Sequence, residues 1–132
     1  MANEAVLMFE YSLPVPMTVA NGTGIEKGAL LALSDPFTAA ASNTSGAAVA
    51  GIAAAEKIAS DGNTRLGVYR EGIFKVVASG AVTVGEAVIF NPANKVAKSE
   101  INSEHIVGVA LETAADGETF LMELKPGHYN LA

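Results

Sequence analysis

The chain has 132 residues, a formal net charge of −6 and no cysteine. This length fits a single domain with a sizeable core, and the lack of cysteine excludes disulfide bridges, thiol catalysis and cysteine-based zinc sites. Only eight Lys and Arg residues are spread along the chain, so we expect no nucleic-acid partner. Half of the residues are hydrophobic but only 6% are aromatic, which predicts a core of small aliphatic side chains.

Residues 1–18 are expected to form an extended N-terminal arm. Its apolar run Ala5–Phe9 is too short for a signal sequence or a membrane-spanning helix and lacks a basic flank, so we expect a soluble protein without a membrane partner. Glu4–Tyr11 can pair as a strand, whereas two prolines interrupt Leu13–Met17 and predict an extended connector or an edge there. The arm could dock on its own sheet or on a neighbour.

The remaining residues, 19–132, are expected to form one β domain that contains a repeat, at about 19–76 and 77–127. Two pairs of glycines share a spacing of 23 residues, namely Gly28 with Gly51 and Gly85 with Gly108. The second glycine of each pair is flanked by alanine and β-branched residues, which is typical of a strand that another backbone or a bulky side chain approaches closely. Such self-similarity at one spacing indicates a duplicated unit.

Turn signals recur at matching places in both halves. Asp-Gly followed by a polar residue and Thr predicts a tight turn, and it occurs at Asp61–Thr64 and at Asp116–Thr119. The apolar runs that follow, Arg65–Tyr69 and Phe120–Leu124, are predicted strands. An earlier turn of each half contains proline, at Asp35-Pro36 and at Asn91-Pro92.

No amphipathic pattern of ten or more residues predicts a helix. Ala47–Ala59 is rich in alanine, but Gly51 in its middle favours a strand. Phe37–Ala48 is predicted to be a loop, Ile73–Val77 a strand that joins the halves, and Lys98–Glu104 at most a single helical turn. The predicted fold class is therefore all-β, a small β-barrel or β-sandwich with an internal pseudo-twofold repeat, an extended N-terminal arm and little helix.

The residue types that carry chemistry do not form a recognisable site. His105 lies beside Glu104 and near Glu100, but without the spacing of a metal site. Gly22 and Gly24 followed by Gly28 miss the spacing of the dinucleotide-binding fingerprint by one position. We expect no catalytic residue, no cofactor and no metal, and hence no enzyme.

Two stretches of the chain resemble the capsid decoration proteins of tailed bacteriophages, also called cement or head-stabilising proteins. They are Ala50–Ala53 followed by Ser60–Phe74, and Ala81–Val88 followed by Ile106–Glu112. The resemblance spans about Val19–Leu124 and implies a compact β domain on the outer capsid surface of a virion assembled in the host cytoplasm. It further implies that the protein binds the major capsid protein, forms a homotrimer and stabilises the shell against internal DNA pressure.

An apolar arm on such a domain suits contact with the capsid or with another subunit. The candidate contact residues are Val6, Met8, Phe9, Tyr11, Phe37, Tyr129 and Leu131. Two alternatives stay open: a virion-surface adhesion or head-fibre module that binds host glycans, and a small β-fold enzyme with a cleft that the sequence does not reveal.

Overall fold

The computed structural model describes residues 3–41, 44–99 and 105–128. Within these ranges the chain forms eleven strands and no helix, so no helix there could cross a membrane. The strands are β1 (Val6–Phe9), β2 (Val15–Thr18), β3 (Leu30–Asp35), β4 (Thr38–Ala41), β5 (Val49–Ala53), β6 (Arg65–Tyr69), β7 (Gly72–Val77), β8 (Ala87–Asn91), β9 (Lys95–Lys98), β10 (His105–Ala110) and β11 (Thr119–His128). The predicted all-β class is confirmed.

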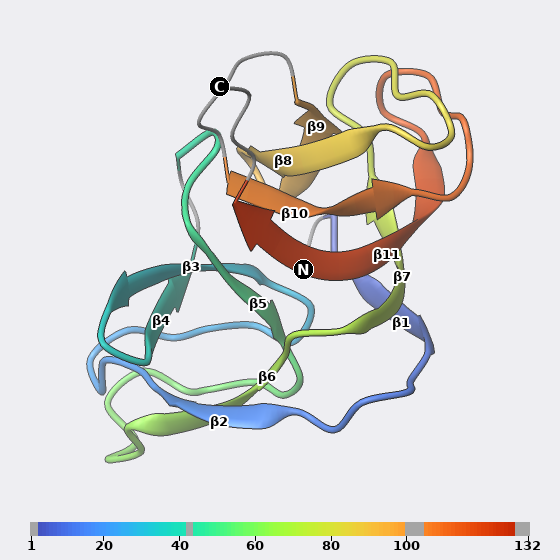
Figure 1. Cartoon of the computed structure of the whole chain (residues 1–132). Helices are drawn as coiled ribbons and strands as arrows, with labels where there is room; N and C mark the ends of the chain where they lie inside the picture. The colour runs from blue at the N-terminus through green and yellow to red at the C-terminus, as the bar shows by residue number, and fades with distance from the viewer. Residues whose placement is uncertain (1–2, 42–43, 100–104, 129–132) are drawn as a thin grey trace.

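The first half of the chain forms a closed five-stranded barrel in the order β2-β4-β3-β5-β6, at the lower left of Figure 1. The β2–β4 pair is parallel, and every other pair of the barrel is antiparallel. Small aliphatic side chains fill the interior, as the composition predicts. The buried residues of this core are Met17, Val19, Ile25, Ala29, Leu31, Ala39, Ala50, Ala53, Leu66 and Val68.

The N-terminal strand β1 and the five strands of the second half form a six-stranded antiparallel sheet in the order β1-β7-β11-β10-β8-β9, in the upper part of Figure 1. A single parallel bridge between Ala78 and Val96 links the end of β7 to β9. The bridge corresponds to the Thr18–Thr38 pair that links β2 to β4 in the barrel. The two halves therefore pair their strands in the same order. The five strands from β2 to β6 correspond, one by one, to the five strands from β7 to β11.

Individual hydrogen bonds also recur between the halves. Ile25 bridges Lys57, and 57 residues later Val82 bridges Ala114. The amide of Gly28 donates to the carbonyl of Ala53 over 3.0 Å, and the amide of Gly85 donates to that of Ala110 over 2.8 Å. The repeated glycines and turns of the sequence thus have repeated structural roles.

The contact between the halves departs from the predicted twofold relation. The turn between β8 and β9 lies against Gly28 through Asn94, whose amide nitrogen donates to the Gly28 carbonyl over 3.2 Å. Gly28 is buried, whereas its counterpart Gly85 is exposed, and a Cβ placed there would meet nothing within 4 Å. A twofold axis requires reciprocal contacts. Among the described residues, this contact is made in one direction only.

The N-terminal segment is part of the body. β1 pairs antiparallel with β7, Ala5 is 4% exposed, and the Ala5 amide donates to the Gly28 carbonyl over 3.1 Å. β2, which also lies within residues 1–18, pairs with β6 from Val15 to Thr18. The sequence left open whether this segment docks on its own sheet or on a neighbouring molecule. In the structure it pairs with strands of its own chain.

The prolines do not prevent β2 from joining the barrel. Backbone N–H groups alternate in direction along a strand, and the Thr18 N–H donates to the carbonyl of Phe37 on the β4 side. Pro16 therefore lacks its N–H on that same side, away from β6, where the parallel pairing has already ended. Proline costs β2 no ladder hydrogen bond with β6.

Other local predictions had mixed outcomes. Ala47–Ala59 contains β5 and Ile73–Val77 lies in β7, as predicted. The prediction of a loop over Phe37–Ala48 was wrong in its first part, because Thr38–Ala41 pairs with β3 as strand β4. Most of the segment Lys98–Glu104 falls outside the described residues.

Candidate docking surface

β1 is a short edge strand of the six-stranded sheet. It pairs with β7 on one side, and within the described residues no strand pairs with its other side (Figure 1). Leu7 packs on the core of the six-stranded sheet, which includes Phe74 and Phe120, and this contact orients the strand. An edge strand presents a row of unpaired N–H and C=O groups that another chain can bind.

A bulge in β1 increases the apolar surface of this edge. Leu7 lies opposite Phe74 and Phe9 opposite Ile73, so Met8 is the extra residue. Side chains of a regular strand alternate between the two faces, and a bulge resets this alternation. Met8 and Phe9 are both exposed as a result, at 45% and 60%.

The exposed apolar residues continue beyond the strand. The β1 strip is defined here as the large apolar and aromatic residues of this segment that are at least 45% exposed: Val6, Met8, Phe9, Tyr11 and Leu13. Four of them were predicted from the sequence as contact residues. Leu13 was not, although it is the most exposed of the strip at 78%. Its place between the arm residues and Pro14 was a signal that could have identified it.

Acidic side chains border the β1 strip. The Tyr11 hydroxyl donates to Oε2 of Glu123 over 2.8 Å. Partial desolvation and this hydrogen bond raise the pKa of Tyr11, and the charge of Glu71 contributes in the same direction. At the next tyrosine, Tyr69, desolvation and a hydrogen bond to Glu10 raise the pKa of the hydroxyl. Both tyrosines therefore stay neutral at physiological pH.

Phe37 lies apart from this strip, in the turn between β3 and β4. It is 52% exposed and adopts a φ of +52°, which is uncommon for a bulky residue. Its counterpart in the second half is Asn94, with a φ of +58°, and asparagine tolerates this conformation well. An exposed phenylalanine in a strained turn position is a candidate contact residue.

Two of the predicted contact residues, Tyr129 and Leu131, lie outside the described residues. Other exposed large apolar residues were not predicted, namely Leu33, Ile58, Val84 and Leu111. Val84 and Leu111 stand where the first half has Lys27 and Ala54. Comparing the two halves position by position would have identified them.

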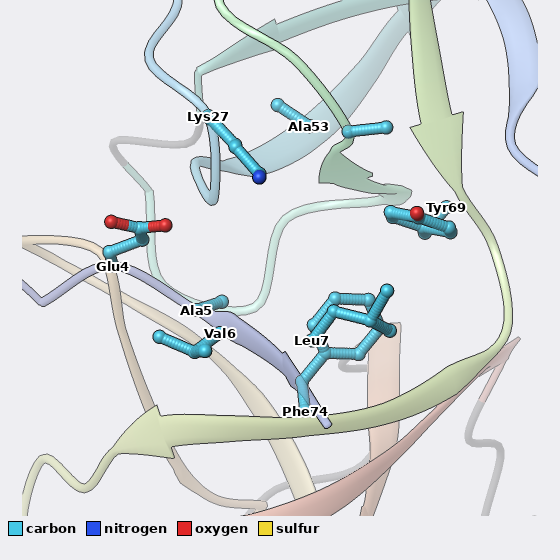
Figure 2. A pocket seen from close by; sticks show the side chains of 9 residues that line it. Glu4, Ala5, Val6, Leu7, Lys27, Ala53, Tyr69 and Phe74 are labelled. Atoms are coloured by element: carbon cyan, nitrogen blue, oxygen red, sulfur yellow. The ribbon is translucent and has the colours of Figure 1, made fainter. Parts of the chain in front are cut away.

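A pocket of about 250 Å³ lies between β1 and the barrel (Figure 2). Leu7 and Phe74 form its apolar side, and the side chains of Glu4 and Lys27 lie at the opposite side. The described part of the chain contains no group of three His, Asp or Glu residues that could hold a metal ion. The lining of the pocket offers no pair of carboxylates of the kind that glycoside hydrolysis requires.

The fold is shared with a phage head component. Over 95% of this chain and 99% of the other, the structure superposes on the crystal structure of the head fibre gp8.5 N base of bacteriophage phi29, with a TM-score of 0.59 and 15% sequence identity. At this identity the likeness concerns the fold alone. No protein with a curated description matches the chain.

The sequence also matches the family described as "Phage cement protein" over residues 12–125. The match covers both halves of the repeat and all strands from β2 to β10, together with most of β11. The chain therefore belongs to the phage cement protein family, whose members are structural, non-enzymatic components of the capsid surface of the virion.

Proposed function

We propose that this protein binds the major capsid protein on the outside of the assembled shell through the β1 strip, and that it stabilises the shell against the pressure of packaged DNA. The observation that carries the proposal is the exposed apolar edge of β1. Monomeric proteins seldom leave contiguous apolar surface exposed unless it is used in binding. Membership of the cement family supplies the kind of partner.

The chemistry of the β1 strip suits another protein. Its aromatic and methionine side chains are types that are enriched in the centres of protein interfaces. The unpaired side of β1 can accept a strand or loop of the capsid protein, with main-chain hydrogen bonds and side-chain contacts acting together. Glu71 and Glu123 beside Tyr11 favour a partner with basic residues at the rim of the contact.

Repeated weak contacts account for firm attachment in this proposal. A stable interface buries on the order of 800 Å² on each partner, which is more than a four-residue strand and its neighbours offer alone. If copies of the chain associate, for example as the trimer that the family resemblance implies, several strips bind the shell together. Their effective concentration then raises the overall affinity by several orders of magnitude.

The test compares binding of Phe9→Glu and wild-type protein to shells that lack the protein. Phe9 is 60% exposed, so the variant is expected to fold normally and to lose apolar contact at the centre of the strip. Binding, measured by co-sedimentation over a range of protein concentrations, should weaken at least about tenfold. Wild-type protein should also reduce DNA release from filled shells on heating.

Ile58→Glu is the matched control. Ile58 is 65% exposed and lies in the connection between β5 and β6, outside the β1 strip, and the variant carries the same added charge. Its binding should equal that of the wild type. Unchanged binding of Phe9→Glu, or an equal loss in both variants, would remove the β1 strip as the capsid contact. Binding of the wild type to host glycans instead of shells would favour the adhesion alternative.

A further inference from the structure

The turn between β8 and β9 joins the second half to the first through one asparagine. The side-chain oxygen of Asn94 accepts a hydrogen bond from the Leu30 amide over 2.8 Å, and its amide nitrogen donates to the carbonyls of Asn3 and Gly28 over 2.9 and 3.2 Å. The surface at the start of β3 is thus covered, by this turn and by the residues before β1.

Both partners of this contact have uncovered counterparts elsewhere in the chain. The turn between β3 and β4 matches the turn between β8 and β9, and it carries Phe37 where the latter carries Asn94. Phe37 is 52% exposed, so its side chain stays largely uncovered. Leu33 in the same hairpin is 40% exposed, whereas its counterpart Phe90 is 1% exposed.

The surface at the start of β8 is the second uncovered counterpart. We define the open patch as Val84, Gly85 and Leu111, which stand in the places of Lys27, Gly28 and Ala54. Val84 is 57% exposed and Leu111 is 39% exposed, and there is open space above Gly85. In the first half, the residues before β1 cover Gly28, since a Cβ there would meet Glu4 and Ala5, and Lys27 and Ala54 line the pocket beside them (Figure 2).

The substitutions between the halves point to what covers these surfaces. Where the contact is internal, the turn carries a polar Asn94 and the surface an exposed Lys27. Where the described chain provides no internal cover, both positions are apolar, Phe37 on the turn and Val84 on the patch. Apolar residues gained on both sides of one contact are expected where that contact forms between molecules.

We propose that copies of this chain associate head to tail, with the β3–β4 turn of one copy seated on the open patch of the next. The contact would repeat between molecules the one that the β8–β9 turn makes within the molecule. Burial of Phe37 against a second copy would offset the strain of its positive φ. The inference specifies the self-association that the proposed function invokes, and it does not depend on attachment to the shell.

The β3–β4 turn and the open patch of one chain lie too far apart to contact each other. In Figure 1 the β3–β4 turn lies at the left, whereas the connections β7–β8 and β10–β11, which contain the open patch, lie at the upper right. A contact between different surfaces of identical molecules is heterologous, and such contacts close into rings when the rotation allows. Because each copy has both surfaces, we expect a multimer in solution.

The experiment uses two variants that the chain itself suggests, with masses measured by sedimentation velocity in the absence of shells. Phe37→Asn introduces the residue of the matching turn, and Val84→Lys introduces the residue of the matching surface. Both are expected to fold, because the other half of the molecule accepts these residues at the same positions. Wild-type protein should sediment as a multimer, and each variant alone as a single chain.

A mixture of the two variants gives the decisive result. The Val84→Lys chain keeps an intact turn and the Phe37→Asn chain keeps an intact patch, so an equimolar mixture should form a dimer of one chain of each kind and nothing larger. Ile58→Lys is the control and should sediment as the wild type does. A wild-type monomer, variants that remain multimeric, or a mixture that stays monomeric would overturn the proposal. Shell binding by the wild type, measured separately, tests the proposed function.

Discussion

Gly51 and Gly108 occupy the same place in the two halves, and each faces the backbone of a neighbouring strand. A Cβ on Gly51 would overlap the carbonyl oxygen of Tyr69, and one on Gly108 would overlap that of Glu123. Both contacts involve main-chain atoms that the sheet holds in place. The sequence pattern predicted a close approach by a backbone or a bulky side chain, and the structure shows that the nearest atoms belong to a backbone.

Gly108→Ala should therefore destabilise the protein. The added methyl group forces β10 away from β11, and overpacking of this kind costs about 1–3 kcal/mol in the free energy of unfolding. Urea unfolding followed by circular dichroism measures the loss. Gly22→Ala is the control, since a Cβ at Gly22 would meet no atom within 4 Å and its φ is not positive. An equal effect of the two substitutions would contradict the proposed role of the β10–β11 contact.

The burial of Lys57 was not predicted from the sequence. It is 2% exposed, and its ammonium group donates to the carbonyls of Asn21 and Ile58 and to a carboxylate oxygen of Asp61 at 3.1 Å. The pKa of Asp61 is lowered, first by the amide of Asn63 and then by this lysine. A lysine is normally expected at the surface, and only the folded turns bring three oxygens around its ammonium group.

At the scale of strands and turns, the sequence predicted local pattern better than partners. The strands β5, β6, β7 and β11 were predicted from apolar runs and flanking turns, which are local signals. The place of β1 was left open, and β2 was not predicted as a barrel strand. The place of β1 depends on which strand of the sheet has an unpaired edge. The pairing of β2 depends on the side of the strand on which Pro16 lacks its N–H group. These are properties of the assembled sheet, and they cannot be derived from one segment.

The β8–β9 turn should be sensitive to substitution of its asparagine. Asn94→Ala removes three hydrogen bonds, leaves the amide of Leu30 without its acceptor, and places alanine at a φ of +58°. We expect a loss of about 2–4 kcal/mol in the free energy of unfolding.

Asn94→Gly separates the two causes, since glycine adopts the positive φ without strain. It should lose less stability than Asn94→Ala, and the difference is a lower bound on the strain, because glycine also loses more backbone entropy on folding than alanine does. Thermal unfolding followed by circular dichroism gives both values. If Asn94→Gly were as stable as the wild type, the three hydrogen bonds would not contribute to the attachment of the turn to β3.

At the scale of the whole molecule, the two halves share a core. Four residues from the first half are buried in the same cluster as the second-half strands: Ala5, Leu30, Val49 and Ile52. Neighbouring residues of β3 and β5, such as Leu31 and Ala50, point into the barrel instead. β3 and β5 thus contribute to both cores, and the halves differ from two linked domains with separate interiors.

This shared core predicts that the described part of the chain unfolds as one unit. Native-state hydrogen exchange should give slow amides in β5 of the barrel and in β10 of the sheet the same free energy of opening, because Ile52 loses its burial when either half opens. Ile52→Ala should lower both values equally, by about 2–5 kcal/mol. A barrel that opened at a lower free energy than the sheet would show that the duplicated halves retain separate stability. The contact made by Asn94 would then be a docking of domains, and the head-to-tail contact between copies would have a weaker internal precedent.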